Sequence, residues 1–137
     1  MDAAAAVLTR VPLFAELDGP DVATLAEAFK EHTFPEGSSV TVEDERGPRV
    51  LAFFVIAEGT ATVSKGGRRL ATLGPSDYFG EVALFLDVPR MATVKADTDL
   101  RCLALSSWEF RPFLEEHSSI AWRLLETMAR RLYEASS

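Results

Sequence analysis

The sequence predicts a mainly β domain, a sandwich or a barrel, with helices at both ends. Short runs rich in β-branched and aromatic residues follow one another between His32 and Leu105, and Gly or Pro separates them. Before and after this block, apolar residues recur at helical spacing instead. At 137 residues, of which 47% are hydrophobic, the chain has the size of one domain with a core of its own.

The N-terminal region, residues 1–31, is predicted to be helical, most clearly from residue 11 to residue 30. Asp18 or Asp21 can cap a helix there, and Pro20 suits its first turn. The apolar residues that fall on one face of this helix are Val22, Leu25, Ala26 and Phe29.

The β-block, residues 32–105, contains six runs that are typical of strands. They are SSVTV, LAFFVIAEG, TATVSK, RRLATLG, MATVKA and LRCLALS. Between the third and the fourth run, the segment KGGR, residues 65–68, indicates a hairpin turn.

The C-terminal region, residues 106–135, is predicted to form two helices. The serine pairs at 106–107 and 118–119 can cap a short helix and a longer one, which runs to about Glu134. The apolar positions at helical spacing in the longer helix are Ile120, Leu124, Leu125, Met128 and Leu132. Trp108, Phe110 and Phe113 of the short helix are predicted to lie in the core, whereas the pattern does not decide between core and lid for Trp122.

The charge balance is acidic, since 14 basic and 21 acidic residues give a net charge of −7. A nucleic-acid backbone needs a basic surface, so this balance disfavours direct nucleic-acid binding by the chain. It still leaves room for one small anion site, because a single buried arginine can bind phosphate on an acidic protein.

Several other classes are disfavoured as well. The chain has no run of 18 apolar residues, so no membrane span is expected, and its start, MDAAAAVLTRVPLF, lacks the basic region of a signal peptide. Cys102 is the single cysteine, which rules out an internal disulfide and a cysteine metal cluster and fits a cytoplasmic location. His32 and His117 lack ligand spacing and are expected at the surface, so neither a metal nor a cofactor is expected. No residue has the surroundings of an activated nucleophile, and the chain is not expected to be an enzyme.

The segment GEVALFLDVPR, residues 80–90, combines apolar residues with an acid near its start and a base at its end. In one interpretation it is a strand and a loop, and Glu81 and Arg90 are solvated ends that form at most a weak ion pair. Composition alone does not choose between this interpretation and a binding site.

The second interpretation is a site for a sugar phosphate. Gly80 lets the backbone approach a ligand closely, and a helical turn over residues 82–86 starts with N–H groups that favour an anion. Arg90 can grip two phosphate oxygens, whereas an ionised Glu81 accepts hydrogen bonds from a pair of hydroxyl groups. The apolar residues around them would line the pocket.

The stretch FGEVALFLDVPRMATVKA, residues 79–96, closely resembles the phosphate-binding cassette of cyclic nucleotide-binding domains. That family includes regulatory subunits of cAMP-dependent protein kinase, cyclic nucleotide-gated channels and bacterial catabolite activators. Its pattern is Phe-Gly-Glu-Leu/Ile-Ala-Leu, a short gap and Arg-Ala/Ser/Thr-Ala-Thr-Val, and residues 79–84 and 90–94 match it. Further segments that resemble the family are VPLFAELDGPDVATLAEAF, FPEGSSV, FFVIAEGTATV, LGPSDYFGE and the helices from Trp108 onward.

The resemblance implies one domain over residues 1–137. Its centre would be a jelly-roll β-barrel over residues 32–105, preceded by a helical segment and followed by two helices, a hinge and a lid. By position, Glu81 and the backbone of Gly80 would hold the ribose 2′-hydroxyl, and Arg90 would pair with the cyclic phosphate. The ligand-binding residues expected on this basis are Gly80, Glu81, Val82, Ala83, Arg90, Met91 and Ala92, with the amides of Ala83, Met91 and Ala92 completing the phosphate cradle.

Two positions depart from the family pattern. Met91 stands where the family usually has a small residue, and a Thr or Ser there can help to hold guanine; Met91 has no hydroxyl, which favours cAMP over cGMP. Asp44 replaces the first glycine of the family's Glu-Gly-x-x-Gly-Asp segment. That glycine is expected to serve a turn, so we expect a local difference in the loop and an intact pocket.

The function expected from the sequence is a regulatory module that binds cAMP, with cGMP as the second candidate, and signals through the helix at 118–134. The candidates to cover the base, among which the sequence does not choose, are Arg123, Thr127, Arg131 and Tyr133. The alternative is a ligand-free domain of the same fold that acts as a protein interaction or dimerisation module. The expected partners are therefore a cyclic nucleotide and, through the C-terminal helix, an effector domain or a second copy. Because no residues remain for a DNA-binding domain, the chain is expected to be a domain of a larger protein or a small sensor.

Overall fold

A computed structural model describes residues 3–45, 53–86 and 88–136. The chain begins with three short helical segments, α1 (Ala3–Leu8), η1 (Pro12–Phe14) and α2 (Gly19–Ala26). Asp18 caps α2, because its carboxylate accepts a hydrogen bond from the Asp21 N–H at 2.9 Å. The predicted apolar face is confirmed for Val22, Leu25 and Ala26, which are buried; Phe29 is buried too but lies beyond the end of α2. The helical region predicted over 11–30 contains η1 and α2, and it ends before Lys30, where a strand begins.

Eight strands form two antiparallel sheets of four strands each, within the described part of the chain. The first sheet has the order β1-β8-β3-β6 and contains β1 (Lys30–Phe34), β8 (Leu100–Leu105), β3 (Phe53–Glu58) and β6 (Tyr78–Phe79). The second has the order β2-β7-β4-β5 and contains β2 (Ser39–Thr41), β7 (Thr93–Ala96), β4 (Ala61–Lys65) and β5 (Arg68–Leu73). The predicted turn at 65–68 joins β4 to β5, with positive φ at Gly66 and Gly67.

The predicted mainly β class is confirmed, but the hydrogen-bonded strands do not close into a barrel. Among the described residues, no ladder joins one sheet to the other. The six predicted runs all contain strands, whereas β1 and β6 were not predicted. Strand β6 has only two residues, and β1 (KEHTF) has mostly polar residues at its start, so neither carries a strong strand pattern.

The first sheet separates two apolar cores, and its strands β3 and β8 contribute buried side chains to both. One core, which we call the helix-side core, lies between this sheet and the helices; it includes Leu8, Phe14, Leu25, Phe53, Val55, Leu84, Leu105, Phe110, Ile120 and Leu124. The other, the inter-sheet core, includes Phe54, Ile56, Ala61, Val94, Ala96, Leu100, Cys102 and Ala104. The run Phe-Phe-Val-Ile of β3 is therefore continuous rather than alternating because both faces of this strand need apolar side chains.

Two helices follow the sheets: α3 (Ser107–Glu116) and α4 (Ser118–Ser136). Ser106 caps α3 by accepting from the Glu109 N–H at 3.2 Å. Phe110 is buried as predicted, but Trp108 is 49% exposed, which corrects its assignment to the core. His117, expected at the surface, is half-buried at the α3–α4 junction, where its ring stacks on Phe113 and its Nδ1 hydrogen-bonds the Phe113 carbonyl.

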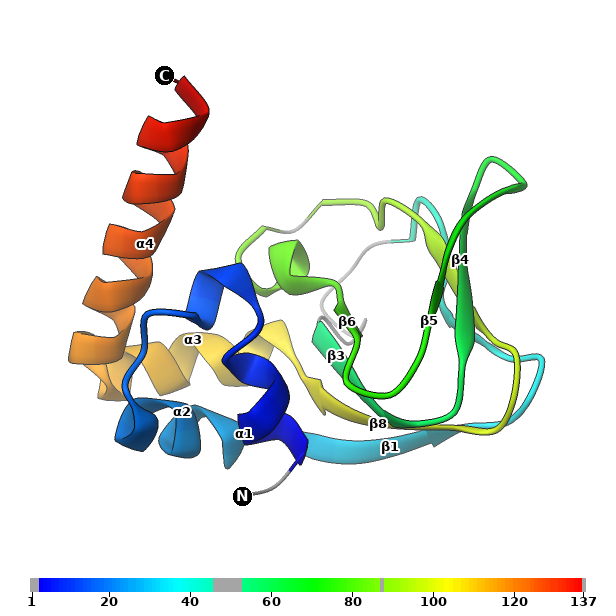
Figure 1. Cartoon of the computed structure of the whole chain (residues 1–137), viewed down its shortest axis with the longest axis horizontal. Coiled ribbons are helices and arrows are strands. Elements are labelled where there is room, and N and C mark those ends of the chain that lie inside the picture. The colour runs from blue at the N-terminus through cyan, green and yellow to red at the C-terminus, as the bar shows by residue number, and fades with distance from the viewer. Residues whose placement is uncertain (1–2, 46–52, 87, 137) are drawn as a thin grey trace.

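Helix α4 stands on one side of the molecule and the β4–β5 hairpin on the other (Figure 1). It packs against η1 and buries Ile120, Leu124 and Thr127. Its opposite face carries exposed apolar side chains, namely Trp122, Leu125, Met128, Leu132 and Tyr133. Trp122, which the sequence left undecided, is thus exposed in this structure. In the described part of the chain, no helix has the length and apolarity needed to cross a membrane.

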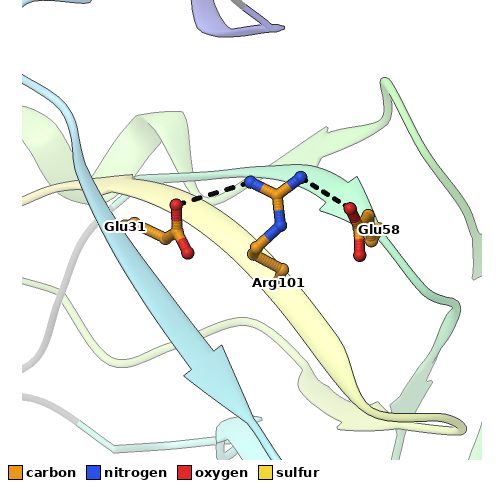
Figure 2. Close-up of polar contacts among 3 residues, drawn as sticks. All are labelled: Glu31, Glu58 and Arg101. Atoms are coloured by element: carbon orange, nitrogen blue, oxygen red, sulfur yellow. Dashed lines mark hydrogen bonds and ion pairs between the residues drawn. The ribbon is translucent and has the colours of Figure 1, made fainter.

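A polar cluster joins three strands on the outer surface (Figure 2). Arg101 of β8 lies between Glu58 of β3, at 2.8 Å, and Glu31 of β1, at 3.4 Å. The hydrogen bond with Glu58 is the main reason why the pKa of Arg101 is raised. All three side chains are solvent-accessible, so the cluster adds little to stability.

Candidate functional site

The seven predicted site residues lie together around one pocket with a volume of about 180 Å³. The lining consists of these seven, Gly80, Glu81, Val82, Ala83, Arg90, Met91 and Ala92, and of Thr41, Val63, Phe79, Val88, Pro89 and Val94. Among the described residues of the lining, three have polar side chains: Thr41, Glu81 and Arg90. The pocket therefore combines an apolar wall with one acceptor and one cationic donor.

Glu81 lies in a short 3-10 turn, η2 (Glu81–Leu84), which Gly80 opens with φ of 90°. Only glycine adopts this φ without strain, so the backbone conformation before Glu81 requires a glycine at position 80. The turn is tight: the Ala83 N–H donates to the Gly80 carbonyl at 3.1 Å. In this structure that amide, predicted to hold phosphate, is thus engaged within the turn.

Apolar contacts fix the turn from two sides. Leu84, at its end, is buried in the helix-side core. Before it, the two residues of β6 point to different cores: Tyr78 contacts Phe53, and Phe79 stacks on Phe54 with ring centroids 5.0 Å apart. Glu81 therefore follows a strand that is held on both faces.

The turn also contacts the C-terminal helices. Phe85, the residue after η2, packs edge-to-face on Phe110 of α3, with ring centroids 5.2 Å apart. Burial raises the pKa of the Tyr78 hydroxyl, the Glu81 carboxylate raises it further, and Arg131 of α4 opposes the shift. Charges of Glu81 and of α4 thus both influence the Tyr78 hydroxyl. Phe85 connects the turn to α3, the helix that precedes α4, through a ring contact.

Arg90 also lines the pocket and is only 8% exposed. Burial lowers the pKa of its guanidinium, and the carboxylate of Glu45 opposes this shift. An arginine remains charged in a protein even so. Because Arg90 is buried in the pocket wall, the interpretation of Glu81 and Arg90 as two solvated ends is wrong.

The segment 41–45 holds the residues around Arg90. The Thr41 hydroxyl donates to the Ala92 carbonyl at 3.1 Å, and the Glu43 N–H donates to the Thr93 hydroxyl at 2.9 Å. Two backbone bonds complete the set, from the Asp44 N–H to the Arg90 carbonyl at 2.9 Å and from the Arg90 N–H to the Glu45 carbonyl at 2.7 Å.

Asp44 has a φ of 69°, in the left-handed region. The family's glycine at this position was expected to serve a turn, and the positive φ confirms that requirement. Asp is one of the few other residues that enter this region at modest cost. The rest of the predicted loop difference falls on residues 46–49, which lie outside the described residues.

The candidates to cover a base are not at the pocket. No residue of α4 is among the described residues that line it. Arg123 instead lies 3.9 Å from the Asp21 carboxylate, Thr127 is buried, and Tyr133 is exposed. In this arrangement the described part of α4 does not cover the site.

Sequence reasoning did not predict the pocket residues that come from other strands, Thr41, Val63 and Val94, nor Phe79, Val88 and Pro89. A signal existed for the strand residues, since each lies in a run with alternating polarity. Alternation shows which residues share a face, but not which strand faces the cassette.

Comparison with known proteins agrees with this geometry. The family model of the cyclic nucleotide-binding domain matches residues 31–117. A cAMP-dependent protein kinase regulatory subunit from Yarrowia lipolytica is 38% identical over 109 residues, which are 78% of this chain and 28% of that protein. The chain thus spans under a third of this relative's length.

Solved structures show the same similarity. The N-terminal domain of a transcriptional regulator from Streptomyces coelicolor A3(2) has 36% identity and a TM-score of 0.81, covering 99% of this chain and 94% of that one. The regulatory domain of Toxoplasma gondii PKA, crystallised with cAMP, has 26% identity and a TM-score of 0.70, covering 85% of this chain and 45% of that one. The chain belongs to the cyclic nucleotide-binding domain family.

Proposed function

We propose that this chain is a regulatory module that binds cAMP and transmits binding to α4, without a cofactor and without catalysis. The observation that carries the proposal is the pocket itself. It has an acceptor carboxylate, Glu81, after a left-handed Gly80, and a buried cation, Arg90, while its remaining wall is mostly apolar. A cyclic nucleotide offers the matching groups: a ribose hydroxyl, one negative phosphodiester and an apolar base face.

The names of two relatives support this ligand. One is called a cAMP-dependent protein kinase regulatory subunit, and the structure of the Toxoplasma gondii PKA regulatory domain was determined with cAMP. cGMP is the second candidate ligand, because both cyclic nucleotides share the ribose and phosphate groups that Glu81 and Arg90 would contact.

Signalling would pass from the turn to α3 and then to α4. Phe85 contacts Phe110, so a shift of the turn changes the packing of α3. Helix α4 follows after His117, and its exposed apolar face would contact the effector or a second copy. A ligand that binds one arrangement of these helices better than another would shift the population between them.

Thermal unfolding with and without ligand tests the proposal. A ligand present at a hundred times its Kd stabilises the folded state by about 2.7 kcal/mol. For a domain of this size, this corresponds to a rise in Tm of about 5–15 °C. We expect that rise with cAMP and a much smaller one with 5′-AMP, whose phosphate carries extra charge and is not tied to the ribose. Equal shifts for both would indicate a generic nucleotide site.

The second candidate function is a ligand-free interaction module. The observation in its favour is the exposed apolar face of α4, with Trp122, Leu125 and Leu132. Titration calorimetry separates the two functions: no heat and no Tm shift with millimolar cAMP or cGMP would favour this candidate. Hydrogen exchange adds a direct check, since cAMP should slow exchange around residues 79–94 and change it in α4.

A further inference from the structure

Thr41 is the one hydroxyl-bearing side chain among the described residues that line the pocket. It belongs to β2, and it is only 3% exposed. The register of β2 against β7 shifts between Ser39 and Thr41, as at a β-bulge. Bulges commonly re-aim a side chain next to a functional site, and here the side chain lines the pocket.

The Thr41 hydroxyl hydrogen-bonds a backbone carbonyl whose charge would affect a bound anion. It donates to the carbonyl of Ala92 at 3.1 Å, two residues after Arg90. Ala92 also lines the pocket. A carbonyl oxygen carries partial negative charge, so a carbonyl of the pocket lining that had no hydrogen-bond donor would repel a phosphate oxygen. By donating this hydrogen bond, the Thr41 hydroxyl satisfies the Ala92 carbonyl oxygen and fixes the orientation of the Ala92 peptide group.

We propose that Thr41 is a positioning residue for the phosphate half of the site, which acts by fixing the peptide of Ala92, a pocket-lining residue two positions after Arg90. The inference rests on the proposed binding of a cyclic nucleotide and adds a residue from outside the cassette. It makes phosphate recognition depend on β2 as well as on residues 79–94. The neighbouring bond from the Glu43 N–H to the Thr93 hydroxyl strengthens the same attachment.

The test compares Thr41→Val, which keeps the shape and removes the hydroxyl, with Thr41→Ser, which keeps the hydroxyl. We expect cAMP affinity to fall about five- to tenfold in Thr41→Val, the range of one net hydrogen bond, and to recover in Thr41→Ser. Thr24→Val is the matched control, because it removes a hydroxyl-to-carbonyl bond of 2.9 Å, to Pro20, outside the pocket. This control should leave affinity unchanged.

A double-mutant cycle separates positioning from a general loss of structure. If Thr41 acts through the arginine half, its effect should shrink in an Arg90→Lys background and stay complete in a Glu81→Gln background. An equal effect of Thr41→Val in both backgrounds, or wild-type affinity in Thr41→Val, would overturn the proposal.

Hydrogen exchange without ligand supplies an independent outcome. Thr41→Val should speed exchange at residues 90–93, whereas Thr24→Val should not. Unchanged exchange there would overturn the positioning role. A wild-type chain that binds no cyclic nucleotide would overturn the proposed function instead, and the exchange experiment would still decide whether Thr41 holds this segment.

Discussion

The two halves of the pocket are held in different ways. The glutamate half, residues 80–84, is a continuous turn whose last residue, Leu84, is buried in the helix-side core. The arginine half, residues 90–93, makes four hydrogen bonds with residues 41–45, three donated by that segment and one donated by the Arg90 N–H, and two of the four join positions 50 and 51 residues apart in sequence. The acid is thus placed by local sequence and apolar packing, while the base is placed by polar contacts with a distant segment.

This difference affects how easily each half of the pocket can move. Apolar burial is non-directional, whereas hydrogen bonds weaken steeply when their angle changes. The glutamate half, which also contacts α3 through Phe85, is therefore better suited to move with the helices. The arginine half is better suited to stay fixed on its sheet.

Leu84→Ala should have the largest effect on stability, because it removes the buried side chain that holds the glutamate half in the helix-side core. Removing a buried leucine side chain lowers the free energy of unfolding by about 2–5 kcal/mol, measurable by urea denaturation. Leu86→Ala is the matched control, because Leu86 lies just after the turn and is exposed. Equal losses in the two variants would contradict the idea that Leu84 anchors the turn.

Arg90→Ala should remove the charge-assisted contact of the other half. We expect cAMP affinity to weaken by about 30-fold or more, or about 2 kcal/mol, while the domain stays folded. Glu81→Gln keeps the shape and loses the charge, so its effect should be smaller. Calorimetry on both variants measures this, and unchanged affinity in a folded Arg90→Ala protein would refute the assignment of phosphate to Arg90.

Substitutions of Asp44 test the segment 41–45, which makes hydrogen bonds with residues 90–93. Its φ of 69° is unfavourable for a β-branched residue, so Asp44→Val should cost about 1–2 kcal/mol of stability. Asp44→Gly fits the same backbone and should change stability by less than about 1 kcal/mol. Thermal unfolding compares the two, and a valine variant as stable as the glycine variant would argue against the left-handed conformation.

Substitution of Met91 should have the smallest effect, a change in the preference between cAMP and cGMP. Its side chain is 66% exposed at the pocket and has no hydroxyl to bind guanine. We therefore expect wild-type protein to prefer cAMP and Met91→Thr to narrow the difference from cGMP by less than about tenfold, the size of one hydrogen bond. Competition with a fluorescent cyclic nucleotide measures both affinities. A wild-type preference for cGMP would contradict the expectation.

Much of the local structure could be read from the sequence. The N-cap residues Asp18 and Ser106 and the Lys65–Arg68 hairpin were predictable, because each depends on side chains within a few residues. The cassette motif likewise predicted that Gly80, Glu81 and Arg90 belong to one site, and they do line one pocket.

The tertiary structure decided what depends on distant partners. Trp108 and Phe110 are both large aromatic residues of α3, yet only Phe110 is buried, because only its side of the helix meets the first sheet and the turn. Strand β1 forms because it pairs with β8, some 70 residues away, and not because its own sequence strongly favours a strand.

By itself, then, the sequence determined the chemistry of the pocket: a glycine that allows a positive φ, a carboxylate and a guanidinium within eleven residues. Only the tertiary structure decided that Arg90 is buried, that the Thr41 hydroxyl hydrogen-bonds the Ala92 carbonyl and that no described residue of α4 lines the pocket. The physical reason is that conformational preference and charge are properties of a residue and its near neighbours. Burial and long-range hydrogen bonds depend on which segments pack together, and strand alternation leaves that choice open.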